Sequence, residues 1–275
     1  MTVGSEHLLF EQDGHVATVT LNRPEAKNAL SLEMIVGLCD AWDEIDSNPE
    51  IRVAILTGAG GHFCAGADLR TVARGTSTAV LGTGGDGLSL ALDADMDHDG
   101  PMGPSRLQLT KPVIAAVEGY AVAGGIELAL WCDLRVAAAS ATFGVFCRRF
   151  GVPLIDGGTV RLTRLIGESR AMDLILTGRA VGADEALALG LANRVVENGQ
   201  ALAAALALAG QIAAFPQQCL RNDRLSARRQ HGLSLRDALA QEFALGLQTL
   251  ASGEAEGGAR RFVEGAGKHG RFGGD

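Results

Sequence analysis

The chain has 275 residues, of which 47% are hydrophobic and 20% are charged, and this composition is typical of a soluble globular protein with a large core. Its formal net charge of -8 at pH 7 argues against a nucleic-acid-binding protein, because such proteins usually carry a dominant basic surface. The five cysteines include no Cys-x-x-Cys pair, so neither a disulfide framework nor a metal site is expected. Without a leader-like start or an apolar run long enough to span a membrane, the sequence predicts a cytoplasmic protein.

Strand and helix patterns alternate along the first part of the chain. Residues 16–21 form a β-rich apolar run that ends at a turn signal, which predicts a strand. Ser31 is a favourable N-cap for a helix that extends to about Ile45. Residues 53–57 are a short apolar run of the buried-strand kind, and a further helix is expected to begin after Ala67. This alternation is typical of an α/β protein.

The second part of the chain begins with a segment of different character. Residues 74–104 are rich in Gly, Asp, Ser and Thr, which indicates a loop or mobile lid. Apolar runs then predict strands at 112–117 and 134–138, with a helix at about 125–131 between them. Residues 200–214 are rich in Ala and Leu and are predicted to be helical, as is the tail that follows them.

Two glycine-rich segments, Cys-Ala-Gly-Ala-Asp at 64–68 and Ala-Gly-Gly-Ile-Glu at 123–127, each follow a predicted strand. Small residues let a ligand approach the backbone, and free N–H groups at the start of a helix favour negative charge. The amides of Ala67 and Gly124 are therefore candidates for an oxyanion hole that stabilises a thioester or ester oxygen. Glu127 lies about one turn into the second helix and is a candidate acid/base.

Each of these features has a purely structural alternative. Glycines after strands often close turns, and a glutamate or aspartate in the first turn of a helix is favoured by the helix dipole without any catalytic role. For Asp68 that alternative is preferred. The run at 58–63 ends in Phe63 where a dinucleotide-binding pattern needs its final glycine, so a Rossmann site is not expected.

Three segments together resemble the signatures of the crotonase (enoyl-CoA hydratase/isomerase) superfamily in order and spacing. They are Asn-Arg-Pro-Glu-Ala-Lys-Asn-Ala-Leu at 22–30, Phe-Cys-Ala-Gly-Ala-Asp-Leu at 63–69, and Gly-Tyr-Ala-Val-Ala-Gly-Gly-Ile-Glu-Leu-Ala at 119–129. The resemblance implies an α/β fold, a crotonase-like spiral of ββα repeats that forms an acyl-CoA-binding core over residues 1–200. It also implies a C-terminal helical region over 201–275 that assembles homotrimers or hexamers, the latter as dimers of trimers.

The resemblance further implies which residues meet an acyl-CoA thioester substrate. The thioester oxygen is expected in the Ala67/Gly124 hole, and no cofactor beyond the coenzyme A moiety of the substrate is expected. Arg23, Lys27 and Arg70 are candidates for its phosphates, with solvated surface charge as the alternative. The coenzyme A moiety is expected to contact Ala26, Lys27, Ala29, Ala65, Asp68 and Leu69.

The sequence departs from the hydratase pattern at one position. Glu127 matches one of the two hydratase glutamates, but Cys147 stands where the second is expected, and a thiol with an ordinary pKa near 8.5 is a poor substitute for a carboxylate. Asp156 is a candidate replacement because isomerase-type relatives carry an acidic residue near this place; the alternative is a turn and N-cap. Arg148 and Arg149 are candidates for bringing positive charge into the pocket.

The resemblance therefore predicts a hydratase that adds water reversibly to a 2-enoyl-CoA, with Glu127 and either Asp156 or ordered water handling the protons. An enoyl-CoA isomerase is the first alternative, because moving one proton between two carbons tolerates the loss of a glutamate better. A catalytically weak acyl-CoA-binding homologue is the second.

Overall fold

The computed structural model describes residues 4–71, 73, 96–97 and 99–267. Most of the loop or lid predicted over 74–104 therefore lies outside the described residues. The chain divides into two compact units, Met1–Gly210 and Gln211–Asp275. Among the described helices, none is long and apolar enough to cross a membrane.

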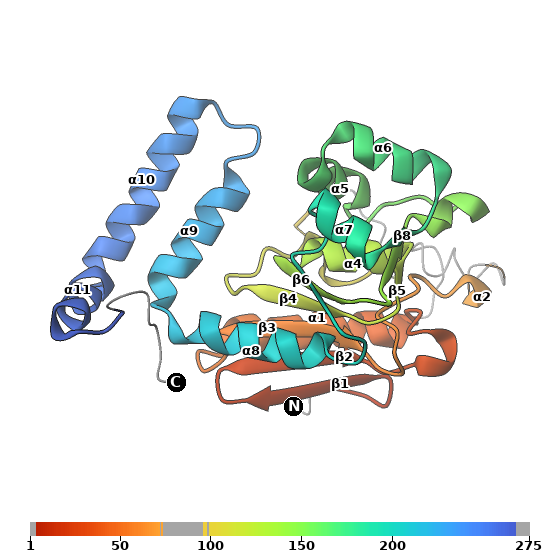
Figure 1. The fold of residues 1–275 in the computed structure, drawn as a ribbon, viewed down its shortest axis with the longest axis horizontal. Coiled ribbons are helices and arrows are strands. Elements are labelled where there is room, and N and C mark those ends of the chain that lie inside the picture. Colours follow the sequence, from red (N-terminus) through yellow and green to blue (C-terminus); the bar gives the residue numbers. More distant parts are fainter. Residues whose placement is uncertain (1–3, 72, 74–95, 98, 268–275) are drawn as a thin grey trace. The chain divides into compact units, whose positions relative to one another are not determined.

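The first unit contains a six-stranded sheet that is parallel except for one N-terminal hairpin (Figure 1). Its central strands are buried apolar runs, as expected of a parallel sheet covered on both faces. The strands predicted at 16–21, 53–57, 112–117 and 134–138 are confirmed. In spatial order the sheet contains β1 (Leu8–Asp13), β2 (Val16–Leu21), β3 (Val53–Gly58), β4 (Val113–Val117), β6 (Leu134–Ala138) and β9 (Arg194–Val196).

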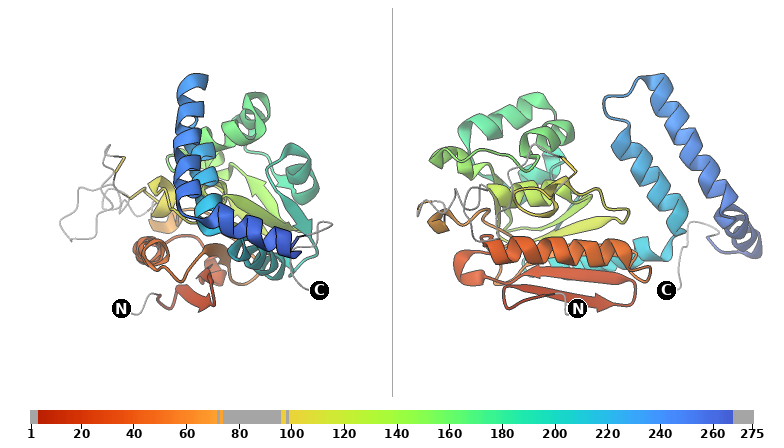
Figure 2. Two further views of the ribbon diagram at one scale, coloured as in Figure 1. Left: turned by 90° about the vertical axis from the view of Figure 1, so that its left-hand side faces the viewer. Right: turned by 180° about the vertical axis from the view of Figure 1, so that it is seen from behind.

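A second, three-stranded sheet and several helices complete this unit. The small sheet contains β5 (Tyr120–Val122), β7 (Thr142–Gly144) and β8 (Val181–Gly182). The helices are α1 (Leu32–Ser47), α2 (Leu69–Thr71), α4 (Gly124–Trp131), α5 (Gly158–Ile166), α6 (Glu168–Thr177) and α7 (Ala183–Leu189), with 3-10 turns η1 (Pro24–Ala26), η3 (Pro104–Arg106) and η4 (Phe146–Phe150). Views from opposite sides show α1 on one face of the large sheet and the beginning of α8 (Ala201–Ala214) on the other (Figures 1 and 2).

Helix α1 forms where the sequence predicts it. The Ser31 hydroxyl accepts a hydrogen bond from the Met34 N–H at 3.3 Å, as an N-cap does. The buried side chains of the helix recur at helical spacing and face the sheet. Near its end, Trp42 packs edge-to-face on Trp131 with ring centroids 4.9 Å apart, which fixes the end of α4.

Helix α4, which carries Glu127, is buried along its whole length. Its last carbonyls are satisfied by a buried arginine: the Arg135 guanidinium donates to the carbonyl oxygens of Cys132 at 2.9 Å and Ala129 at 3.3 Å. The same side chain donates to the Leu191 carbonyl at 2.6 Å. Arg135 therefore ties the end of this helix to the strands beside it.

Replacing Arg135 with methionine is expected to lower the free energy of unfolding by about 3 kcal/mol, because buried carbonyls lose their donor. Thermal unfolding followed by calorimetry measures the effect. Arg194→Met, at an exposed arginine on the edge strand β9, is the control and should change stability little. Equal losses in the two variants would contradict the structural role of Arg135.

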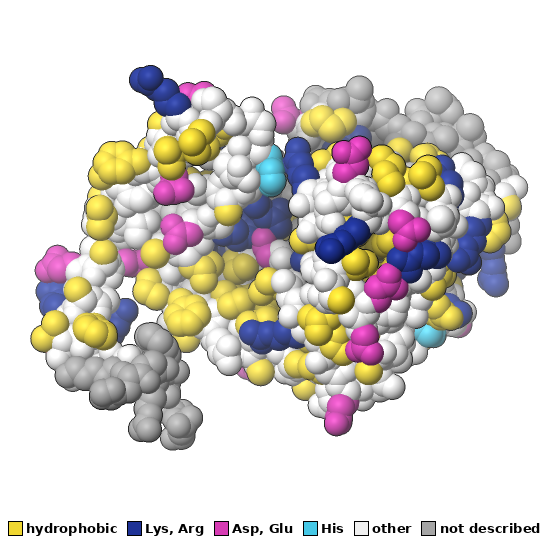
Figure 3. Space-filling view, turned by 45° about the horizontal axis from the view of Figure 1, so that its top comes forward, with side chains coloured by type: hydrophobic (Ala, Val, Ile, Leu, Met, Phe, Trp, Pro, Cys, Tyr) yellow, Lys and Arg dark blue, Asp and Glu magenta, His cyan; other side chains and the backbone are white. Residues whose placement is uncertain are grey.

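The second unit is helical, as predicted for the tail. It contains the end of α8, α9 (Gln217–Arg229), α10 (Leu235–Ala251) and α11 (Glu254–Glu264). The buried Asn222 amide on α9 donates to the Leu245 carbonyl and the Thr249 hydroxyl on α10, both at 3.0 Å. This polar contact fixes how the two helices pair. Hydrophobic side chains remain at the surface of the helical unit (Figure 3).

Candidate active site

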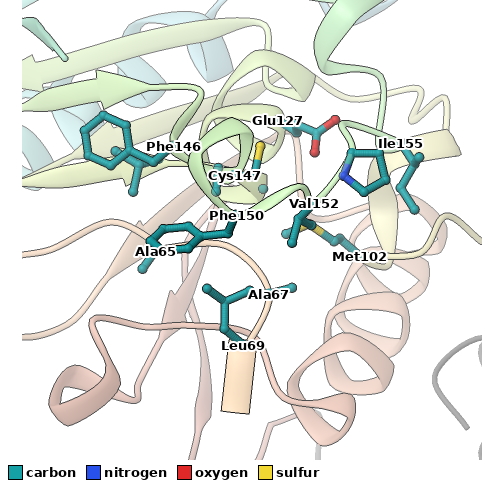
Figure 4. Close-up of a pocket in the computed structure, with 14 residues that line it drawn as sticks. Ala65, Ala67, Leu69, Met102, Glu127, Phe146, Cys147, Phe150, Val152 and Ile155 are labelled. Atoms are coloured by element: carbon teal, nitrogen blue, oxygen red, sulfur yellow. The ribbon is translucent and has the colours of Figure 1, made fainter. Parts of the chain in front are cut away.

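A cavity of about 260 Å³ lies in the first unit, beside the start of α4 (Figure 4). Among the described residues that line it, Glu127 carries the one carboxyl group and Cys147 the one thiol, and the other side chains are apolar. Such a cavity, apolar with few polar groups, is typical of a small-molecule site. The lining residues are Ala65, Ala67, Leu69, Met102, Val122, Ala123, Gly124, Glu127, Phe146, Cys147, Phe150, Val152, Pro153 and Ile155.

The two glycine-rich segments lie side by side at this cavity. Cys64 bridges to Ala121, with its N–H donating to the Tyr120 carbonyl at 2.8 Å and its carbonyl accepting from the Val122 N–H at 3.0 Å. Within the described part of the chain, the N–H groups of Ala67 and Gly124 have no protein acceptor. Two free N–H donors from adjacent segments are what an oxyanion hole requires.

The backbones of the two segments approach each other so closely that Gly66 and Gly125 leave no room for a Cβ. A Cβ on Gly66 would lie 2.7 Å from the Gly124 nitrogen, and Gly66 has a φ of +92°, which favours glycine. A Cβ on Gly125 would lie 2.0 Å from the Cys64 carbonyl oxygen. Ala123 adopts a φ of 53° immediately before Gly124. The small residues let the two segments contact each other, which places the two N–H groups at one cavity wall.

Glu127 lies in this cavity with its carboxyl almost fully buried. One carboxyl oxygen, Oε1, accepts from the N–H groups of Asp156 at 2.9 Å and Gly158 at 2.8 Å. Burial, followed by the charge of Asp156, raises the pKa of Glu127 to about 7. A carboxyl group with this pKa can both accept and donate a proton near neutral pH.

The same pKa predicts a pH-dependent stability cost. Because the folded-state pKa of about 7 exceeds the ordinary value of 4.5, the stability contributed by this group is full below pH 4.5 and is lost as the pH rises through 7. The loss corresponds to about 3 kcal/mol. Glu127→Gln removes the ionisation, so the melting temperature of the parent protein should fall relative to the variant between pH 5 and 8. If calorimetry gave the same change of melting temperature with pH for the parent protein and for Glu127→Gln, the raised pKa of Glu127 would be ruled out.

Asp156 is close to Glu127 but does not line the cavity. Its buried carboxylate oxygen Oδ1 accepts from the Met102 N–H at 2.9 Å and the Ser105 hydroxyl at 2.5 Å. This placement differs from the expectation that Asp156 handles a substrate proton, because the side chain points from a loop into protein contacts. It favours a structural role, but not the N-cap considered from the sequence, because Gly157 occupies the N-cap of α5 and no side chain caps that helix.

Cys147 lines the cavity, and its sulfur lies on the same side as the Glu127 carboxyl (Figure 4). Burial, followed by the charge of Glu127, raises the pKa of the Cys147 thiol. The thiol therefore remains neutral at physiological pH and does not replace the charge of a second glutamate.

Arg148 and Arg149 do not line the cavity, contrary to the sequence interpretation, although the charge of Arg148 acts on the Cys147 thiol. Arg148 donates to the Ile175 carbonyl at 3.2 Å, and Arg149 donates to the Gly178 carbonyl at 2.6 Å. The Arg149 guanidinium also stacks 4.0 Å from the Phe146 ring centroid. Both arginines satisfy carbonyls at the end of α6, where a cation is favourable.

Of the residues expected to contact coenzyme A, Ala65 and Leu69 line the cavity. Ala26 ends η1 and Ala29 is buried beside it. The exposed Lys27 places its ammonium 4.5 Å from the Tyr120 ring centroid, and its carbonyl accepts from the Ala65 N–H at 3.0 Å. The two predicted segments are therefore brought together.

Asp68 pairs with Arg23 at 2.8 Å. Although partial burial acts in the opposite direction, hydrogen bonds from the Arg70 N–H and from Arg23 lower the pKa of Asp68. Arg23 also donates to the Ala29 carbonyl at 3.2 Å. These contacts indicate a structural role for the pair, rather than the phosphate contact considered for Arg23.

Asn28 does not line the cavity but supports the segment at 26–29, a role that was not predicted from the sequence. Its fully buried amide donates to the carbonyls of Ala59 at 2.9 Å and His62 at 2.7 Å, and accepts from the Arg23 N–H at 2.9 Å. The side chain thus joins the loop before α1 to the loop after β3. The sequence feature that could have pointed to Asn28 is its position between Lys27 and Ala29, in a segment otherwise expected to contact coenzyme A. Among the described residues, no group of three or more His, Cys, Asp or Glu side chains is placed to hold a metal.

Comparison with known proteins decides the family. A family model described as enoyl-CoA hydratase/isomerase matches residues 11–269. The chain belongs to the enoyl-CoA hydratase/isomerase family. It is 41% identical over 263 residues to enoyl-CoA hydratase EchA19 of Mycobacterium tuberculosis, covering 93% of each chain. The family assignment, and with it an enzyme of the enoyl-CoA hydratase type, agrees with the resemblance found in the sequence.

Solved structures show the same fold. The crystal structure of an enoyl-CoA hydratase from Mycobacterium tuberculosis H37Rv matches with a TM-score of 0.84 and 38% identity, over 98% of this chain and 100% of the other. That of enoyl-CoA hydratase EchA1 from Mycobacterium marinum matches with a TM-score of 0.83 and 38% identity, over 94% and 96%. The predicted α/β fold of the crotonase family is thereby confirmed, with a helical C-terminal region.

Proposed function

We propose that this enoyl-CoA hydratase-type enzyme adds water reversibly to a 2-enoyl-CoA thioester, with Glu127 as its principal acid/base. The observation that carries the proposal is the pairing of two free N–H groups, those of Ala67 and Gly124, with one buried carboxyl in an otherwise apolar cavity. No cofactor beyond the coenzyme A moiety of the substrate is proposed.

The reaction follows from where charge develops. As the oxygen of water bonds to the β carbon, the carbon–carbon π electrons shift toward the thioester, and negative charge collects on its oxygen. Donors fixed at that oxygen supply several kcal/mol of transition-state stabilisation. The Glu127 carboxylate accepts a proton from the attacking water, and the α carbon then receives a proton from the Glu127 carboxyl or from ordered water. The net change is H and OH added across the double bond.

Isomerisation is a second candidate, favoured by Cys147. Because this neutral thiol lines the cavity with Glu127, a one-base reaction uses the groups at hand: Glu127 removes the α proton of a 3-enoyl-CoA and returns it to the γ carbon. Incubation with crotonyl-CoA, followed by loss of the enoyl absorbance, tests hydration. Absence of hydration together with conversion of 3-enoyl-CoA to 2-enoyl-CoA would overturn the first proposal in favour of the second.

The coenzyme A moiety is proposed to bind along the segments at 26–29 and 65–69. Hydrogen bonding between these segments supports this, because Lys27 and Ala65 are directly joined. Lys27 is exposed and not paired with a carboxylate in the described contacts, so its ammonium is the proposed phosphate contact. Arg23 is not, because Asp68 holds it.

The helical unit is proposed to assemble the protein into homotrimers or hexamers. Helix α10 carries a stripe of exposed large side chains, including Leu235 at 77%, Phe243 at 68% and Leu250 at 64% exposure. Such a stripe is typical of an association surface. Light scattering after size exclusion should show a trimer or hexamer, and Phe243→Asp should shift it toward monomer, whereas Leu187→Asp on α7 should not. A monomeric parent protein would overturn this part of the proposal.

A further inference from the structure

The segment at 100–105 is built around the Asp156 carboxylate. Oδ1 of Asp156 accepts from the Met102 N–H and the Ser105 hydroxyl, at 2.9 and 2.5 Å. At Gly100, a Cβ would lie 1.8 Å from the Ser105 hydroxyl oxygen and 3.2 Å from the Asp156 Oδ1. A side chain at position 100 would therefore displace the groups that hold the carboxylate.

A second contact fastens the same segment independently of that carboxylate. Arg161 on α5 donates from Nη1 to the Asp156 carbonyl at 2.8 Å and from Nη2 to the Ser105 carbonyl at 2.5 Å. Gly157 leaves room for this guanidinium, since a Cβ there would lie 2.2 Å from Arg161 Nη1. The loop before α5 and the segment at 100–105 are thus joined at two points.

Asp156 and Met102 each contact one of the proposed catalytic groups. The Asp156 N–H donates to Oε1 of Glu127 at 2.9 Å. The Met102 side chain packs directly against Gly124, where a Cβ would lie 2.1 Å from its sulfur. Asp156 therefore contacts the acid/base, Glu127, through its backbone N–H. Through its carboxylate it also holds Met102, whose side chain packs against Gly124 at the oxyanion hole.

We propose that Asp156 is a positioning residue of this enzyme: its carboxylate holds Met102 against Gly124, and its negative charge tunes the acid/base behaviour of Glu127. The inference rests on the proposed function, because it assigns Asp156 a role that acts through Glu127 and Met102 and not on the substrate.

The charged surroundings support the electrostatic part. Facing Glu127 are Asp156, Arg161 on α5 and the Cys147 thiol on η4. Burial is the largest cause of the raised Glu127 pKa, and Asp156 is the charged group that adds to it; Arg161 and the N–H groups of Gly158 and Asp156 oppose it. A like charge nearby disfavours ionisation, so removing it should favour the carboxylate.

The contacts of Asp156 favour its ionised form against the effect of burial. Burial is the largest influence and raises the pKa of Asp156 overall, while the Ser105 hydroxyl, the Met102 N–H and the charges of Arg106 and Arg161 act to lower it. Hydrogen bonds donated to a carboxylate stabilise the charged form. The two donors of the segment at 100–105 therefore favour the charge that acts on Glu127.

Asp156→Asn tests the proposal, because asparagine keeps the shape, the Oδ1 acceptor and the backbone N–H while removing the charge. The kcat/KM for hydration of crotonyl-CoA, or for isomerisation of a 3-enoyl-CoA, should retain its dependence on the ionised Glu127. The acidic limb of its pH profile should move to lower pH by about one unit. The maximum should fall by less than about tenfold, since Asp156 does not contact the substrate.

Asp46→Asn is the matched control. Oδ1 of Asp46 also accepts from one backbone N–H and one hydroxyl, those of Thr110 at 2.8 and 2.7 Å, and Asp46 does not line the cavity. Its pH profile should coincide with that of the parent enzyme. An unmoved acidic limb in Asp156→Asn would overturn the electrostatic role. A thousandfold loss at every pH would overturn positioning in favour of direct catalysis.

A second readout does not depend on turnover. The decline in melting temperature between pH 5 and 8 that is expected from Glu127 should be smaller in Asp156→Asn than in the parent protein, and unchanged in Asp46→Asn. An equal decline in all three proteins would overturn the inference even if neither substrate were converted. Failure of the proposed function would show separately, as absent turnover by the parent enzyme.

Discussion

Replacing Glu127 with glutamine is expected to lower kcat/KM about a thousandfold, which corresponds to about 4 kcal/mol of lost transition-state stabilisation. Glutamine keeps an oxygen that can accept from the N–H groups of Asp156 and Gly158. The geometry of the cavity should therefore be preserved, while the group that exchanges a proton is lost. Steady-state kinetics with the substrate that the parent enzyme converts measure the loss of proton exchange. Calorimetric binding of a saturated acyl-CoA shows whether the geometry of the cavity is preserved.

Glu254→Gln is a matched control for this variant. The Glu254 carboxylate also accepts from two backbone N–H groups, those of Gln218 at 3.0 Å and Cys219 at 2.9 Å, but it lies in the helical unit. Its kcat/KM should stay close to that of the parent enzyme. If the parent protein instead bound acyl-CoA but turned over a panel of thioesters only weakly, and Glu127→Gln did not change that rate, the protein would be a catalytically weak acyl-CoA-binding homologue.

Replacing Gly66 with alanine is expected to lower kcat about a hundredfold, the effect of losing one oxyanion-hole donor. The added Cβ would lie 2.7 Å from the Gly124 nitrogen, and the neighbour it meets is backbone. The contact can therefore be relieved only by moving one of the two segments that present the donors. Single-turnover kinetics report the loss in the chemical step.

The left-handed backbone at Gly66 adds a stability cost that has to be separated from this effect. Gly199 has a similar φ of +78°, and a Cβ there would meet nothing within 4 Å. Gly199→Ala should therefore lose stability comparably but keep full activity. Similar kinetics in the two alanine variants would show that the close approach at Gly66 does not position the hole.

The sequence predicts elements well where local pattern and burial agree. Helix α1 has both an N-cap and a helical apolar spacing, and β3 and β4 are continuous apolar runs. Strand β1 was not predicted, because Leu8–Asp13 is half polar and lies exposed at the sheet edge. The very short strand β8 takes its conformation from pairing with β7, 38 or more residues earlier in the chain.

The candidate site was predictable to the extent that backbone motifs define it. The glycine segments indicated Ala67, Gly124 and Glu127, because helix starts and small residues leave a sequence pattern. The directions of the Asp156 and Arg149 side chains could not be predicted from the sequence. Each is set by partners that are distant in the chain, such as Met102 for Asp156 and Gly178 for Arg149. The orientation of a loop side chain is determined by its tertiary contacts, which a local sequence pattern does not reveal.

A crystal structure of the Glu127→Gln variant with a bound 2-enoyl-CoA tests most directly whether Ala67 and Gly124 form the oxyanion hole beside residue 127. The thioester oxygen is expected roughly 2.7–3.1 Å from the nitrogens of both Ala67 and Gly124. The β carbon is expected to face residue 127, with Asp156 still holding Met102 against Gly124. A thioester oxygen directed away from either N–H group, or an acyl chain bound outside this cavity, would contradict the proposed oxyanion hole.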